Sequence, residues 1–263
     1  MTDSPPDSFL RPVKVILLLL VGGLVYLVAL MATLPAGWLW QQVEPRVELP
    51  PGVSVDRVTG SLWQGTATLA VVDRKVEAGW QVHSPSFANR ALPLSFSIAS
   101  ASSSVSGGLQ VGWSGETAVN ADGRIRVADF EREIRQAGGA MLAGDIVIDR
   151  LDLKFTQAAL LNAEGLARWA GGEVSWPMAG STERADFPPM EARVNGDDQG
   201  LALTITQAGQ AAPVAETDIL ANGMMDLKVY KRLVDLAGQP WSGAAQPGDV
   251  VFRVRQPLLP DGT

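Results

Sequence analysis

The side chains that could catalyse a reaction are few and scattered in this chain of 263 residues. There is one histidine, His83, in the segment Val82-His83-Ser84-Pro85, and there is no Gly-x-Ser-x-Gly segment. A catalytic triad needs a histidine between a nucleophile and a carboxylate, whereas this segment is typical of a strand end followed by a turn. We therefore predict no catalytic residues, with His83 an exposed or half-buried loop residue.

Two groups of carboxylates could act as a general acid and base. Asp145, Asp149 and Asp152 are close in sequence, as are Asp197 and Asp198. A glycosidase needs two carboxylates that converge in a cleft, but Asp149 and Asp152 bracket an expected turn. Asp197 and Asp198 lie between two glycines. We interpret both groups as solvated turn residues and keep an exported hydrolase as the weakest alternative.

Cofactor and metal chemistry finds little support in the composition. The absence of cysteine excludes thiolate catalysis, cysteine zinc sites and iron–sulfur clusters, and with one histidine a zinc site would need mostly carboxylates. The Gly-Gly pairs lack the lysine or the strand–helix context of a phosphate-binding loop. A formal net charge of -7 argues against nucleic acid, whose phosphates favour basic faces. We predict no metal and no cofactor.

An uncharged apolar segment near the N-terminus predicts where the rest of the chain lies. Residues 15–34 read VILLLLVGGLVYLVALMATL, and a helix of this length spans about 30 Å, the thickness of a bilayer's hydrocarbon core. Arg11 and Lys14 precede it and the next charge is Glu44, which places the N-terminus in the cytoplasm. The residues that represent this anchor are Val15, Leu20, Tyr26, Leu30 and Leu34.

A cleaved signal peptide is the alternative interpretation of the same segment. Its apolar core is usually roughly 7–15 residues long and ends at an A-x-A-like site. Here the core is longer, and Leu34 and Pro35 precede Ala36, so we favour the anchor.

The chain is therefore divided into four parts. We predict a cytoplasmic tail over residues 1–12, a transmembrane helix over 13–34, an exported β-rich domain over 35–255 and a flexible tail over 256–263. Trp38 and Trp40 follow the helix directly. Aromatic residues favour the membrane–water boundary, so we expect these two to form an interface belt.

Short alternating runs in the exported part predict strands with one apolar face. Examples are Leu151, Leu153 and Phe155, and Leu201, Leu203 and Ile205. The fold predicted is mainly β: a curved antiparallel sheet, either with an open groove or closed as a flattened sandwich or barrel. One to three short helices complete it, over Phe130–Ala137 with Asp129 as its cap, over Leu227–Ala237, and as a turn near Ala158–Leu161.

Three segments carry a recognisable family pattern. The first is Thr33–Trp38, and the second is Val58–Ala67, a turn with Gly60, Ser61, Leu62, Trp63 and Gly65. The third is Gly171–Pro177, with Gly171, Gly172, Val174 and Trp176. Together with the length, the single anchor and the β-rich exported part, they resemble the protein N family of the type II secretion system. The middle, roughly residues 84–115, matches more loosely, and Ser100–Ser104 is richer in serine than the family pattern.

The resemblance implies a location more than a mechanism. Such a protein is an accessory, non-enzymatic, single-pass subunit of the bacterial inner membrane, with its N-terminus cytoplasmic and its C-terminal domain periplasmic. Its partners would be the bilayer and other inner-membrane secretion subunits with periplasmic domains, and the machine exports folded proteins across the outer membrane of Gram-negative bacteria. Taken alone, Gly60 and Gly65 allow backbone angles barred to other residues, and Leu62 and Trp63 could cover a sheet edge, either as a plain hairpin or as a partner contact.

A second resemblance concerns architecture. One N-terminal helix followed by a long curved antiparallel sheet is similar to the AsmA-like group, in which a concave apolar face can hold acyl chains. Two short helices are little cover for so many strands with one apolar face each. Either the sheet folds on itself, which suits a scaffold, or an apolar groove stays open, which suits lipid binding.

Overall fold

The computed structural model describes residues 20–23, 25–26, 30, 33–47, 49, 52–71, 74–86, 90–136, 139–156, 159–178, 181–220 and 222–257. Its helices are α2 (Ala36–Val43), η1 (Glu44–Arg46), η2 (Val127–Phe130), α3 (Glu131–Gln136) and α4 (Lys231–Leu236). Its strands are β1 (Val53–Gly60), β2 (Gln64–Val71), β3 (Arg74–Val82), β4 (Ala91–Ala99), β5 (Ser104–Gly112), β6 (Thr117–Arg126), β7 (Met141–Leu142), β8 (Asp145–Phe155), β9 (Leu160–Trp169), β10 (Gly172–Met178), β11 (Ser181–Phe187), β12 (Met190–Asp197), β13 (Gly200–Gln207), β14 (Pro213–Leu220), β15 (Met224–Tyr230) and β16 (Val250–Pro257).

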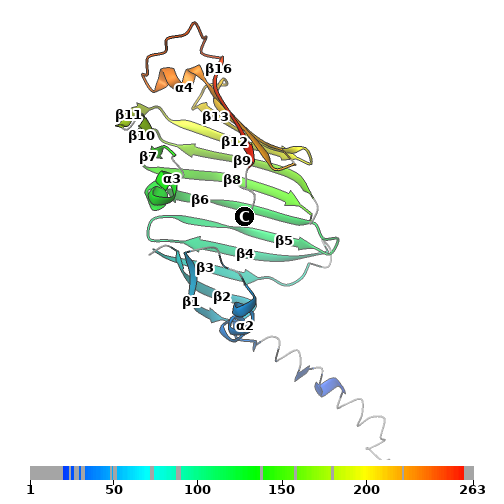
Figure 1. Ribbon diagram of the computed structural model, residues 1–263. Coiled ribbons are helices and arrows are strands. Elements are labelled where there is room, and N and C mark those ends of the chain that lie inside the picture. The colour runs from blue at the N-terminus through cyan, green and yellow to red at the C-terminus, as the bar shows by residue number, and fades with distance from the viewer. Residues whose placement is uncertain are drawn as a thin grey trace, which may run out of the picture.

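One thirteen-stranded antiparallel sheet forms most of the molecule (Figure 1). Its order, β1-β2-β3-β4-β5-β6-β8-β9-β12-β13-β14-β15-β16, keeps successive strands adjacent, and the skipped strands β7, β10 and β11 form a separate three-stranded sheet. At roughly 4.8 Å between neighbours, twelve spacings extend the large sheet over about 58 Å along its curve. The two edges β1 and β16 do not pair with each other. Of the two predicted forms the sheet therefore has the open one, and it is not closed as a sandwich or barrel.

Strand register divides the sheet into an apolar and a polar face. Residues opposite each other in an antiparallel pair lie on the same face. One row on the apolar face crosses five strands and consists of Val82, Leu94, Leu109, Val119 and Leu153. A second row crosses seven and consists of Ile148, Ala167, Ala192, Ile205, Ala215, Val229 and Phe252. The predicted face shared by Leu201, Leu203 and Ile205 is confirmed.

The opposite face carries charged and hydroxyl groups. A row on it runs through Arg193, Thr204, Glu216, Lys228 and Arg253. Lys228 Nζ donates to Asp218 at 2.8 Å, and the Tyr230 hydroxyl donates to Glu216 at 2.5 Å. The hydrogen bond to Glu216 raises the pKa of Tyr230 to about 12, because the carboxylate stabilises the protonated phenol. Each strand therefore presents alternate residues to two different environments, as the sequence pattern predicts.

The closed part of the core lies near the C-terminal end of the sheet. Its buried residues are Trp169, Val174, Met190 and Val214, and α4 packs on them through Leu233 and Leu236. The three-stranded sheet contributes Leu142, Trp176 and Phe187 to the same cluster. In Figure 1 these covering elements lie beside the β9–β13 end, whereas β3–β6 are drawn without an overlying layer.

The helices differ in three respects from those predicted. Residues 227–230 belong to β15, and helix α4 begins only at Lys231, because residues 225–229 pair with β14 and continue the sheet. Leu160 and Leu161 lie in β9 rather than in a helical turn, and Ala158 lies outside the described residues. Asp129 is not a helix cap but part of the turn η2, which precedes α3.

The predicted anchor falls mostly on residues that the structure does not describe. Of its representatives, Val15 lies outside the described residues, and Leu20, Tyr26 and Leu30 are exposed. In the part of the chain that the structure describes, no helix has both the length and the apolar character needed to cross a bilayer. At the other end, β16 continues to Pro257, two residues into the predicted tail.

Candidate functional site

The first two family segments, some twenty-five residues apart in sequence, lie against each other in space. Leu62 N donates to the carbonyl of Leu34 at 3.2 Å, and Pro35 forms a β-bridge with Ser61. Helix α2 then packs on β1. The hairpin between β1 and β2 therefore fixes where the chain enters the sheet, and we call Leu34–Trp38 together with Gly60–Gly65 the entry hairpin.

Glycine is needed at three positions of the entry hairpin because backbones or rings approach closely. Gly60 has φ +92°, and a Cβ there would lie 2.4 Å from the carbonyl oxygen of Gln64. At Gly65 a Cβ would lie 2.4 Å from the Trp80 ring, and at Gly37 it would lie 2.9 Å from the carbonyl oxygen of Val58. These contacts are too short for any larger residue without movement of the backbone or of the indole.

Polar bonds complete the same turn. Ser61 Oγ accepts hydrogen bonds from the backbone N–H of Trp63 at 3.3 Å and of Gln64 at 3.2 Å, as hydroxyl-stabilised turns do. Trp80 Nε1 donates to the carbonyl of Leu62 at 3.2 Å, and Val82 N donates to Trp63 O at 2.6 Å. The hairpin tip is thus held by strand β3 as well as by its own strands.

Three large apolar side chains remain exposed around the entry hairpin: Trp38, Leu62 and Trp63. Trp40, the second residue of the predicted belt, is half-buried. An exposed apolar cluster of this kind suits contact with a partner or with a membrane interface.

The third family segment is part of the hydrophobic core and not of an exposed surface. Val174 is one of the four buried core residues, and Trp176 packs against them. Gly171 has φ +85°, and a Cβ there would lie 2.7 Å from the carbonyl oxygen of Phe187. This segment shapes the cover over the C-terminal end of the sheet.

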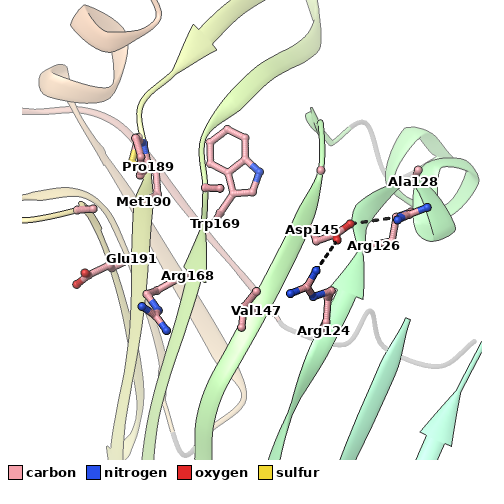
Figure 2. A pocket seen from close by; sticks show the side chains of 13 residues that line it. Arg124, Arg126, Ala128, Asp145, Val147, Arg168, Trp169, Pro189, Met190 and Glu191 are labelled. Atoms are coloured by element: carbon pink, nitrogen blue, oxygen red, sulfur yellow. Dashed lines mark hydrogen bonds and ion pairs between the residues drawn. The ribbon is translucent and has the colours of Figure 1, made fainter. Parts of the chain in front are cut away.

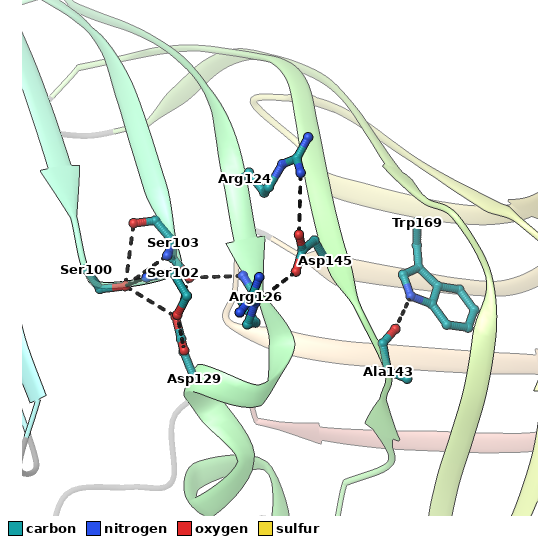
Figure 3. A network of polar contacts seen from close by, with 9 residues as sticks. All are labelled: Ser100, Ser102, Ser103, Arg124, Arg126, Asp129, Ala143, Asp145 and Trp169. Atoms are coloured by element: carbon teal, nitrogen blue, oxygen red, sulfur yellow. Dashed lines mark hydrogen bonds and ion pairs between the residues drawn. The ribbon is translucent and has the colours of Figure 1, made fainter.

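An apolar cavity lies between that cover and the sheet. Its volume is about 890 Å³, and its walls come from strands β8 to β16, from α4 and from the segment around Trp241. Ala167 of β9 and Phe252 of β16 both line it, so the sheet must coil around it. The indole N–H of Trp169, a wall residue, donates to the carbonyl of Ala143 at 2.7 Å (Figure 3). The cavity is suited to an aliphatic occupant because its walls are almost entirely hydrocarbon.

A second groove, of about 710 Å³, lies beside the ends of β6, β8, β9 and β12 and is charged. Figure 2 shows Arg124 and Arg126 converging on Asp145, at 3.6 and 3.3 Å. Arg168 on the same wall forms an ion pair with Asp149, and this hydrogen bond lowers the pKa of the Asp149 carboxyl. Arg168 and Asp149 balance each other, whereas Arg124 and Arg126 share one carboxylate. The arginines are largely exposed, and such surface pairs contribute little to stability.

The carboxylates singled out in the sequence occupy strands as well as turns. Asp149 and Asp152 do not bracket a turn: both lie within β8, which is continuous apart from bulges. Asp197 ends β12 and accepts a hydrogen bond from Gln199 N at 2.9 Å, so it is a turn residue as predicted. His83 Nε2 lies 2.8 Å from Ser95 Oγ, and the described residues place no carboxylate on the histidine. Nor do they include a group of three or more metal-ligating side chains.

Sequence reasoning missed one polar network. Asp129 accepts hydrogen bonds from the hydroxyls of Ser102 at 2.6 Å, Ser103 at 2.6 Å and Ser100 at 3.2 Å (Figure 3). The bonds from Ser102, Ser103 and Ser100 lower the pKa of Asp129. The serine-rich loop before β5 is therefore fastened to η2, and the unusual serine content was its signal.

Comparison with known proteins agrees with the second and third family segments, whereas the first lies before the matched range. The model of the family described as type II secretion system (T2SS), protein N, matches residues 51–248. This range includes every strand from β1 to β15. Searches among curated proteins and among solved structures give no match.

Proposed function

This chain belongs to the protein N family of the type II secretion system, and we propose that it is a non-enzymatic accessory subunit of that system. In this proposal residues 13–34 anchor it in the inner membrane, and the sheet stands in the periplasm and contacts other subunits of the inner-membrane platform. The observation that carries the proposal is the family match over 51–248, three quarters of the chain.

The entry hairpin supports a role in positioning. The hydrogen bond from Leu62 to Leu34 and the packing of α2 on β1 join the segment that follows the proposed anchor to the first edge of the sheet. A sheet about 58 Å long that is fixed at one edge would hold its other strands at a defined distance from the membrane. The exposed side chains of Leu62 and Trp63 would then meet a partner close to the membrane surface.

The topology can be tested with single cysteines, because the native chain has none. Ser114, in the exposed turn after β5, is changed to cysteine in one variant, and Ser4 in another. A membrane-impermeant maleimide applied to spheroplasts should label S114C and should label S4C only after lysis. Labelling of S4C in intact spheroplasts, or protection of S114C, would contradict the proposed orientation.

The partner contact needs a separate test. A photo-crosslinking amino acid at Trp63, in cells that make the whole secretion system, should give adducts with inner-membrane subunits. The matched control places it at Trp113, an exposed tryptophan in the turn after β5. Equal adducts from both positions would show that the entry hairpin is not the contact.

A second candidate function is the binding of lipid acyl chains. The continuous apolar face and the cavity of about 890 Å³ favour it. A fluorescent fatty acid should bind the purified chain, and Ala192→Phe, which fills the cavity, should weaken that binding. If Ala192→Phe and the native chain bind the probe equally, the cavity does not hold the acyl chain and the scaffold proposal stands alone.

A further inference from the structure

The two edges of the large sheet are protected to different degrees. Strand β1 carries a bulge between Val55 and Arg57, and α2 packs on it, with Gly37 against the carbonyl of Val58. Bulges, charged residues and covering helices are the devices by which proteins prevent pairing at sheet edges. Edge β1 is therefore closed to a further strand.

Strand β16 is less protected: among the described elements no helix packs on it, although it carries two arginines and a register irregularity between Val250 and Phe252. It is eight residues long, and its register with β15 is regular from Phe252 to Pro257. Among the described residues no strand pairs with its outer edge. Its apolar side chains stay accessible, with Phe252 55% and Val254 44% exposed. A long, regular edge with an exposed apolar face is a template for the addition of a strand.

The polar face of β16 adds a charge preference. Arg253 and Arg255 both donate to one carboxylate, Asp226 on β15, at 2.8 Å and 2.8 Å. Asp226 is 5% exposed and is shielded between strands, whereas both arginines are largely exposed. The charged side chains of the edge strand itself, next to which an added strand would lie, are therefore both positive, while the carboxylates that balance them lie on inner strands. Opposite charges across a strand pair are stabilising and like charges are destabilising.

We propose that the outer edge of β16 binds an extended segment of a partner protein by strand addition, and that this segment alternates apolar and acidic residues. Its apolar side chains pack beside Phe252 and Val254 and its acidic ones beside Arg253 and Arg255. A second copy of this chain fits less well. Among antiparallel registers that keep the apolar faces of two β16 strands on the same side, the two that pair the most residues are centred on Arg253 or on Val254. Both set arginines opposite or diagonal to arginines. The head-to-tail alternative is blocked because β1 is covered.

The test uses the full chain in detergent and two fluorescent eight-residue peptides, one of alternating valine and glutamate and one of alternating valine and lysine. Fluorescence anisotropy should show that the acidic peptide binds roughly tenfold more tightly than the basic one. Arg255→Gln, which removes one of the two positive charges on the edge strand, should reduce that preference. Hydrogen exchange should show new protection of β16 amides when the acidic peptide is bound, since strand addition uses the backbone of the edge.

A pair of matched variants distinguishes binding at the edge from non-specific binding to exposed apolar residues. Val254→Lys on the edge strand should weaken the acidic peptide roughly tenfold, whereas Val111→Lys should leave its affinity unchanged. Val111 is similarly exposed, at 41%, but lies on β5, which has neighbours on both sides. Equal weakening by both variants, equal binding of both peptides, or binding without protection of β16 would overturn the proposal. A dimer that forms with rising concentration in sedimentation and is abolished by Val254→Lys would also overturn the proposal. It would show that a second copy of the chain, and not a partner protein, occupies the edge. Because the peptides test the edge alone, failure here leaves the secretion assignment untouched.

Discussion

Two alanines on the same face of β9 should respond with opposite signs to the same substitution. Ala167 lines the apolar cavity between the sheet and its cover. Ala163, four residues earlier on that face, is 1% exposed and sits between Leu153 of β8 and Gly196 of β12. Replacing each alanine with leucine tests whether the cavity is real space, because the added side chain is identical.

The magnitude follows from the carbons added. Leucine adds three carbons to alanine, and burial of each is worth about 0.8 kcal/mol, an upper limit of about 2.4 kcal/mol. Fixing the leucine rotamer costs about 0.5–1 kcal/mol, so Ala167→Leu should raise the free energy of unfolding by about 1–2 kcal/mol. At Ala163 there is no free volume, and overpacking should lower the free energy of unfolding by about 1–3 kcal/mol.

Urea denaturation of the full chain in detergent measures both variants, with the slope of the transition checked against the native chain. The midpoint should move up for Ala167→Leu and down for Ala163→Leu. If both midpoints fall by similar amounts, the space beside Ala167 is filled by packing and the coiled-sheet description of the cavity is wrong.

Three further variants test the entry hairpin, the serine network and the strand faces. Gly65→Ala should lower the free energy of unfolding by about 1–3 kcal/mol, because its Cβ would meet the Trp80 ring and a carbonyl, whereas Gly248→Ala, in open space, should change little in the same urea titration. Asp129→Ala should destabilise the chain at neutral pH. Hydrogen bonds lower the pKa of Asp129 in the folded chain below the ordinary value of 3.8. The stability difference between the native chain and Asp129→Ala should therefore be complete above that pH and should disappear in thermal melts at lower pH. Leu203→Asp should cost about 1–3 kcal/mol, since its half-buried carboxylate would face the apolar side, and Thr204→Asp, on the polar face beside Arg193, should shift the urea midpoint by less than about 1 kcal/mol.

Local pattern predicted a large part of this fold because side-chain direction in a strand repeats every two residues. The alternation of Leu201, Leu203 and Ile205 was enough to place them on one apolar face, and the glycines of Gly60–Gly65 were enough to predict a tight turn. The family segments predicted membership in the secretion family, which the comparison confirmed.

Where the sequence pattern allowed more than one local structure, contacts with residues distant in sequence determined which one formed. The spacing of residues 227–237 suits a helix, but residues 225–229 are strand because β14 lies alongside to accept their backbone hydrogen bonds. The serine content of the loop was unusual, but the bonds of Ser102 and Ser103 with Asp129 join residues more than twenty positions apart, and no local rule identifies that partner.

The alternation of apolar and polar residues could not predict whether the sheet closes. An open sheet, a sandwich and a barrel all need strands with one apolar face, so the same period describes all three. The choice depends on how far β16 coils toward β8 and on which elements cover the apolar rows. Both depend on residues about a hundred positions apart, such as Ile146 and Phe252, which line the same cavity. In the described part of the chain the result is an unpaired outer edge on β16 and a cavity beside Ala167.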